Sequence, residues 1–156
     1  MLNSSMRSLL ILLFFPLLLV GAFKEGDIFF PVIFTDQFDQ NVSILTKDQV
    51  VIVVFDKAGY YDVNAFVKSK REGYLRKMKI RYLNDISAMP ENILKFFVKP
   101  NMQKKPFSIL LVKDEKFSQK LNYRDGKITV YHLKEGKIVK IDFVERDGLE
   151  KVIEEQ

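Results

Sequence analysis

Val50-Val51-Ile52-Val53-Val54-Phe55 runs directly into Asp56-Lys57-Ala58-Gly59-Tyr60-Tyr61-Asp62. The first stretch is continuously apolar, and five of its six residues are Val or Ile. A strand that is covered on both faces has this pattern, whereas a strand with one wet face alternates apolar and polar residues. The first stretch therefore predicts the centre of a sheet buried on both sides. The second predicts a loop at the carboxyl end of that strand.

A helix is expected directly after this loop. Asp62 stands where an N-cap is expected, and Gly73 disfavours helix by roughly 1 kcal/mol relative to Ala. The apolar residues after Asp62 share one broad arc of a helix, namely Val63, Phe66, Val67, Tyr74 and Met78. Because Lys70 and Lys77 interrupt this arc, we expect the helix to break or end near Gly73.

Strands and helices alternate outward from this centre. Asp27–Phe34 contains Pro31, which favours an edge strand or an extended leading segment over a central strand. The other expected elements are a turn at 35–41, a strand at Val42–Leu45, a strand at Lys79–Leu83, a loop at 84–90, a short helix from Pro90 through Phe97, a strand at Phe107–Val112, a hairpin of Lys127–Leu133 and Lys137–Val144, and a last helix that begins at Asp147 with Glu150 in a capping box.

This order of elements resembles the thioredoxin-like fold. Gly26-Asp27 with Thr35-Asp36-Gln37 is similar to the opening of peroxiredoxins and TlpA-type proteins, and Val50–Phe55 takes the place of the strand that leads into their redox loop. The segment from Lys105 to Leu111 resembles their cis-proline segment, and Gly136–Ile153 resembles their closing strand and helix.

The resemblance extends from Phe23 to Ile153 and implies an α/β fold. We expect a thioredoxin-like three-layer sandwich, in which a central mixed β-sheet is flanked by helices and preceded by an N-terminal β-hairpin. The resemblance also implies a cis peptide bond between Lys105 and Pro106, packed beside the loop at 56–62.

The absence of cysteine separates this chain from the redox enzymes of that fold. Where they carry C-x-x-C, this chain has the residues from Asp56 to Asp62, and no Cys occurs anywhere in its 156 residues. Thiol-disulfide exchange and thiol peroxidase chemistry need a thiolate, so both are excluded. The chain resembles a cysteine-less, secreted bacterial branch of the superfamily whose function is not established.

Few other sites for chemistry or cofactors are recognisable. The single histidine, His132, lies in an expected strand with Ile128 and Val130 on the same face, so we interpret it as a packed side chain and not as a general base. No G-x-G-x-x-G or phosphate-binding loop is present, and one His without Cys gives no ordinary metal site. We expect no cofactor and no metal.

The N-terminus resembles an export signal. Arg7 precedes the apolar stretch from Leu9 to Val20, which is too short to span a bilayer, and Val20-Gly21-Ala22 fits a signal-peptidase site. We therefore expect a signal peptide at residues 1–22, cleavage after Ala22, and a domain of residues 23–156 in the periplasm. Retention of the stretch as a membrane anchor is the alternative.

Positive charge is concentrated in one segment of the expected domain. Seven Lys and Arg residues lie between Lys68 and Arg81, opposed there only by Glu72. A solvated face explains such a cluster, because cations stabilise the carboxyl end of a helix. Weak contact with an anionic surface is the alternative, through Lys68, Lys70, Arg71, Arg76 and Lys77. No nucleic-acid-binding motif accompanies the cluster, so we expect no nucleic-acid partner.

The binding site is expected in the crevice beyond the carboxyl ends of the strands. Its candidate residues are Lys57, Tyr60, Tyr61, Lys105 and Pro106. Two tyrosines and lysines suit a peptide or a small anionic ligand. The alternative is that one tyrosine packs under the loop while the other is merely exposed.

These observations favour an exported, redox-inactive binding or accessory module that contacts a protein or peptide in the envelope. We expect it to be a monomer. Two alternatives stay open: an enzyme with non-thiol chemistry in the same crevice, and an envelope-associated structural protein that uses its basic face.

Overall fold

The computed structural model describes residues 21–29 and 32–154. Most of the expected signal peptide, residues 1–20, and Pro31 lie outside this range. The strands are β1 (Val32–Asp36), β2 (Asn41–Ile44), β3 (Val50–Val54), β4 (Ile80–Asp85), β5 (Leu110–Val112), β6 (Ile128–Lys134) and β7 (Lys137–Val144). The helices are α1 (Lys57–Lys68), α2 (Tyr74–Lys77), α3 (Glu91–Ile93), the π-helical η1 (Leu94–Val98), α4 (Lys99–Met102), α5 (Glu115–Ser118) and α6 (Arg146–Glu154).

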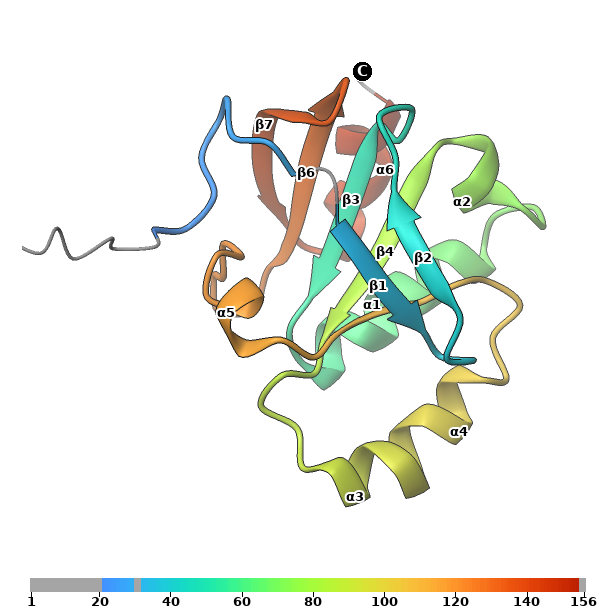
Figure 1. Cartoon of the computed structure of the whole chain (residues 1–156). Coiled ribbons are helices and arrows are strands. Elements are labelled where there is room, and N and C mark those ends of the chain that lie inside the picture. The colour runs from blue at the N-terminus through green and yellow to red at the C-terminus, as the bar shows by residue number, and fades with distance from the viewer. Residues whose placement is uncertain (1–20, 30–31, 155–156) are drawn as a thin grey trace, which may run out of the picture.

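All seven strands form one mixed sheet in the order β2-β1-β5-β4-β3-β6-β7 (Figure 1). β3 is parallel to β4 and β4 is parallel to β5, while the remaining neighbours are antiparallel. The predicted α/β fold with a mixed sheet, flanking helices and an N-terminal β1–β2 hairpin is confirmed.

The central strand divides its side chains between two cores, as its unbroken apolar run predicts. Val50, Ile52 and Val54 pack against α1, α2 and α6 on one face of the sheet. Val51 and Val53 pack on the other face against a cluster that includes Phe23 and Phe29 from the N-terminal segment. All five side chains are fully buried, so hydrophobic burial on both faces fixes β3 in place.

The N-terminal segment differs in part from its prediction. β1 begins only at Val32 and lies between β2 and β5, so it is not an edge strand. Residues 26–29 run along the start of β7, where Ile28 bridges to Lys137 and the Phe29 amide donates to the Gly136 carbonyl at 2.9 Å. The predicted alternative of an extended leading segment is therefore correct for residues 26–29. The predicted edge strand is not formed, because β1 pairs with β5 as well as with β2.

The middle of the chain contains more helix than predicted. Figure 1 shows α3, η1 and α4 as one helical segment below the sheet, and it continues through Pro100 to Met102 instead of ending at Phe97. Pro100 is tolerated because it lies at the first turn of α4. β5 begins at Leu110, later than the predicted Phe107, and α5 follows it at a position where no helix was predicted.

The C-terminal third agrees more closely with its prediction. β6 and β7 form the predicted hairpin, and Glu135 and Gly136 both have positive φ at its turn (52° and 81°). The last helix starts at Arg146, so Asp147 lies in its first turn and the predicted N-cap at Asp147 is wrong. A carboxylate in the first turn still stabilises the positive end of the helix dipole.

Candidate functional site

The loop predicted at residues 56–62 is the start of α1. Asp56 is the N-cap, and its Oδ1 accepts a hydrogen bond from the Gly59 amide at 2.7 Å. The predicted N-cap at Asp62 is therefore wrong, because the helix begins as soon as β3 ends. Gly59 suits this turn, since a Cβ there would lie 3.3 Å from Asp56 Oδ1. Lys57, Tyr60 and Tyr61 thus lie on a helix and not on a loop.

The two tyrosines have different environments. Tyr60 is 8% exposed and its hydroxyl donates to Asn101 Oδ1 on α4 at 3.2 Å. Burial raises the pKa of Tyr60, and the neighbouring Asn64 amide opposes part of that rise. Tyr61 is 53% exposed, and its ring centroid lies 5.8 Å from the Lys57 ammonium. One tyrosine packs and the other is exposed, which is the alternative that the sequence left open.

Lys105 and Pro106 do not take the place that the resemblance implies. They lead into β5, which pairs with β1 and β4, whereas the antiparallel neighbour of β3 is β6. Because β5 runs parallel to β4, its amino end points away from the edge at which β3 delivers the chain to α1. Pro106 therefore does not precede the strand beside β3, and its packing beside the start of α1 stays a prediction. The isomer of the Lys105–Pro106 peptide stays a prediction.

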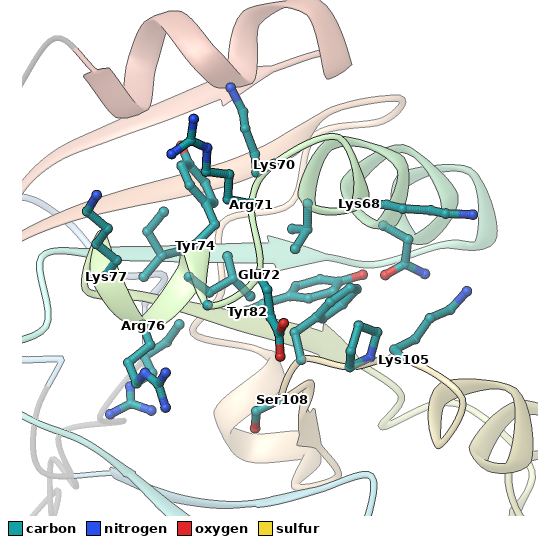
Figure 2. A pocket seen from close by; sticks show the side chains of 18 of the residues that line it. Lys68, Lys70, Arg71, Glu72, Tyr74, Arg76, Lys77, Tyr82, Lys105 and Ser108 are labelled. Carbon is teal, nitrogen blue, oxygen red and sulfur yellow. The ribbon is translucent and has the colours of Figure 1, made fainter.

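A groove of about 1150 Å³ runs along α1. Its walls are α1 from Tyr61 to Lys68, the segment from Lys70 through α2, the first half of β4, and residues 104–108; we call it the α1–α2 groove (Figure 2). Tyr61, Lys105 and Pro106 all line it, but Lys57 and Tyr60 do not. The structure therefore brings together three of the five predicted site residues.

The lining of this groove is strongly basic. It includes all five cations predicted as an anionic-surface contact, Lys68, Lys70, Arg71, Arg76 and Lys77. Lys79 and Arg81 of the same basic segment also line it, and three more cations come from other segments, namely Lys47, Lys104 and Lys105. Figure 2 shows Lys68 and Lys105 pointing to the same side of the groove, while Arg76 and Lys77 point to the opposite side. Only Asp48 and Glu72 contribute carboxylates to the lining.

Ion pairs hold two of these cations within the fold. Lys70 pairs with Glu150 of α6 and lies over the rings of Phe66 and Tyr74, which explains why this lysine interrupts the apolar arc of the helix. Arg81 Nε donates to the buried Asp48 Oδ2 at 2.9 Å. No ion pair involves the other eight cations within the described part of the chain.

Asn64 is a groove residue that the sequence analysis missed. It is 6% exposed, yet neither its amide nitrogen nor its amide oxygen has a hydrogen-bond partner of ordinary geometry within the described structure. The hydroxyl of Tyr74, which also lines the groove, is buried without a partner as well. The sequence did contain a signal, because Asn64 is a polar residue between the core residues Val63 and Phe66.

His132 is packed in the sheet, as predicted. Its Nε2 lies 2.7 Å from Asp142 Oδ2 on the neighbouring strand β7, and Lys140 Nζ lies 3.2 Å from the same oxygen. The side chain is buried and is not part of the lining of the α1–α2 groove. The described residues contain no group of three or more His, Asp or Glu side chains that could hold a metal ion.

Comparison with solved structures identifies the fold of this chain. No family model matches the chain, and no curated protein matches it. Among solved structures, the thioredoxin domain of a thiol-disulfide oxidoreductase from Bacteroides vulgatus covers 86% of this chain and 98% of its own, at 17% identity and a TM-score of 0.58. A peroxiredoxin-like protein from Aquifex aeolicus covers 86% of each chain at 13% identity and a TM-score of 0.54.

A thio-disulfide isomerase from Thermus thermophilus covers 84% of this chain and 95% of its own, at 15% identity and a TM-score of 0.52. The chain therefore has a thioredoxin-like fold. Since it contains no cysteine, the thiol-based mechanism of an oxidoreductase is excluded. In the described part of the chain, none of the helices has the length and apolar character needed to cross a bilayer.

Proposed function

We propose that this protein is an exported, redox-inactive thioredoxin-like module that binds a protein or peptide partner in the cell envelope. The observation that carries the proposal is the α1–α2 groove, in which Tyr61 and Pro106 are exposed beside Lys105 although they come from distant parts of the sequence. A concave surface that combines aromatic and aliphatic side chains with convergent polar groups is the usual form of a ligand-binding site.

The start of α1 supports a binding role over a catalytic one. In this chain the Asp56 carboxylate accepts the hydrogen bond of the Gly59 amide, so this free amide of the helix terminus is satisfied by the protein itself. Tyr60 is engaged with Asn101. Two polar groups at the former redox position are thus engaged in structural contacts, although Lys57 and Ala58 are exposed, and the groove lies farther along α1.

Export is supported by the sequence and by the position of Phe23. The apolar stretch from Leu9 to Val20 fits a signal peptide. Cleavage after Ala22 leaves Phe23 as the first residue, and Phe23 is a core residue that contacts Phe29, Phe117 and Tyr131. The proposed cut therefore removes only residues that precede the core.

Site-specific photocrosslinking in the organism's own envelope tests the binding role. A photoreactive amino acid replaces Tyr61 in the full chain, and the matched control replaces Val139 on β7, which is 50% exposed and outside the groove. The expected result is a discrete adduct of defined mass at position 61 that is absent at position 139. No adduct at position 61, or the same adducts at both positions, would refute the proposal. Fractionation of the same cells tests export.

A further inference from the structure

We propose that the α1–α2 groove binds an extended, acidic segment of a protein partner, with Asn64 pairing with the backbone of that segment. This inference rests on the proposed function and specifies the chemistry of its partner. Three features of the groove support it: uncompensated positive charge, an apolar floor, and buried polar groups without partners.

The charge of the groove exceeds what its own carboxylates can balance. Ten Lys and Arg side chains line it, against Asp48 and Glu72. Asp48 is already paired with Arg81, and Lys70 is paired with Glu150 from outside the lining. Like charges held at close range repel one another, and a concave surface raises the local concentration of the opposite ion. Carboxylates of a partner would relieve this repulsion and pair with several cations at once.

The floor of the groove favours a peptide over a bare polyanion. The lining also includes apolar side chains: Ala65 and Phe107 are partly exposed, and the core residues Val67, Leu75, Ile80 and Tyr82 lie beneath them. The rings of Tyr82 and Phe107 are in contact, with centroids 6.2 Å apart. An extended peptide directs successive side chains to opposite sides, so apolar residues can face the floor while acidic residues reach the rims. A chain of phosphates would leave the floor uncovered.

Asn64 provides the feature that a flat anionic surface cannot use. Its carboxamide offers one acceptor and two donors, which is the complement of a peptide group. Both amide atoms are buried and lack a hydrogen-bond partner of ordinary geometry, although the amide lies close enough to the Tyr60 hydroxyl to oppose part of the burial-induced rise in its pKa. The side chain must therefore turn toward the groove to meet a partner, and it would gain well-formed hydrogen bonds there. A peptide lying in the groove can supply a backbone N–H and C=O there. A bilayer or a nucleic-acid duplex contacts the lysines of the rims without reaching this buried amide.

Fluorescence anisotropy with a labelled peptide tests the inference on the purified chain from Phe23 onward. The probe alternates Glu with Leu and Ala, and a matched probe carries Gln in place of every Glu. We expect the Gln probe to bind about tenfold more weakly, and the affinity of the acidic probe to fall with salt. Equal binding of both probes would overturn the inference.

Three variants locate the bound peptide. Lys68→Glu with Lys105→Glu, which changes one lysine of α1 and one of the 104–108 segment, should weaken binding of the acidic probe about tenfold. Lys134→Glu with Lys137→Glu makes the same charge change at the β6–β7 turn, outside the groove, and should leave binding within about twofold. Asn64→Leu keeps the charge and should weaken binding about fivefold through loss of the backbone contact.

Each contrary result has a defined meaning. If the turn variant loses as much affinity as the groove variant, binding reflects net charge and the inference fails. It also fails if Asn64→Leu has no effect, or if single-stranded DNA or vesicles of anionic lipid bind as tightly as the acidic peptide and compete with it. In any of these cases a specific crosslink at Tyr61 would still support the proposed function, so the two proposals can fail separately.

Discussion

The Gln37 amide Nε2 donates a hydrogen bond of 2.7 Å to the carbonyl oxygen of Phe107. The Oε1 atom of the same side chain accepts from the Ile109 amide at 2.8 Å, so one side chain pairs with the backbone on both sides of Ser108. Gln37 is fully buried and follows β1. It therefore fixes the segment before β5, which carries Lys105 and Pro106 along one wall of the α1–α2 groove.

Replacing Gln37 should loosen this wall. Gln37→Ala leaves the Phe107 carbonyl and the Ile109 amide without their partners, and we expect a loss of about 2 to 4 kcal/mol in the free energy of unfolding. Urea denaturation measures the loss, and hydrogen exchange should accelerate at residues 103–109. Gln40→Ala, at an exposed position nearby, is the control and should change stability by less than about 0.5 kcal/mol. Equal losses in the two variants would contradict the assigned role.

The start of α1 can be tested with two aspartates. Asp56→Ala removes the N-cap and should cost about 1 kcal/mol, whereas Asp62→Ala, within the helix, should cost less than about 0.5 kcal/mol. Urea denaturation of both variants decides between the two positions. A larger loss of stability for Asp62→Ala than for Asp56→Ala would mean that the helix begins at Asp62, as the sequence pattern predicted.

Cleavage after Ala22 predicts both the mass and the stability of the exported chain. The Phe23 amide donates to the Lys120 carbonyl at 2.7 Å, and its ring is buried among aromatic side chains. Intact-mass measurement of the exported protein should give a chain that begins at Phe23. A chain that begins at Lys24 should be less stable in urea than one that begins at Phe23 by about 3 kcal/mol, because it leaves a cavity in the core. Equal stability would show that Phe23 does not belong to the core.

The buried tyrosines predict a loss of stability in alkali. Burial raises the pKa of Tyr82 well above its ordinary value of 10.0, and it also raises the pKa of Tyr131, whose hydroxyl bonds to Asn122. The unfolded chain then releases these protons at lower pH than the folded chain does. The stabilisation is complete below pH 10 and is lost as the pH rises through the folded-state values.

Urea denaturation at a series of pH values up to 11 measures this loss. Tyr82→Phe is a more informative variant than Tyr131→Phe, because it removes a titrating hydroxyl with little loss of hydrogen bonding. The Tyr82 hydroxyl makes one long contact, 3.5 Å to the Tyr60 carbonyl. The stability of this variant should fall less steeply with pH than that of the parent. Parallel slopes for parent and variant would show that Tyr82 does not contribute to the alkaline transition.

The sequence determined the features that depend on neighbouring residues. The unbroken run from Val50 to Val54 predicts a strand buried on both faces, and Glu135-Gly136 predicts a tight turn; both are confirmed. Gly73, with a φ of 75°, separates α1 from α2 where a break in the helix was expected. Local sterics, turn geometry and apolar periodicity decide such features. The absence of cysteine is equally a property of the sequence alone, and it excludes thiol chemistry.

The tertiary structure alone decided which segments meet. Pro106 precedes an apolar strand, as the family's proline does, but that strand pairs with β1 and β4, while β6 occupies the place beside β3. Strand order depends on long-range pairing, which the local pattern around Pro106 does not contain. Asn64, Lys68 and Lys105 likewise line one groove only because β4 and the helical segment α3–η1–α4 bring the chain back from α1 to residues 104–108. The candidate site is a product of topology, because its charge and its unpaired amide come from segments that are far apart in the sequence.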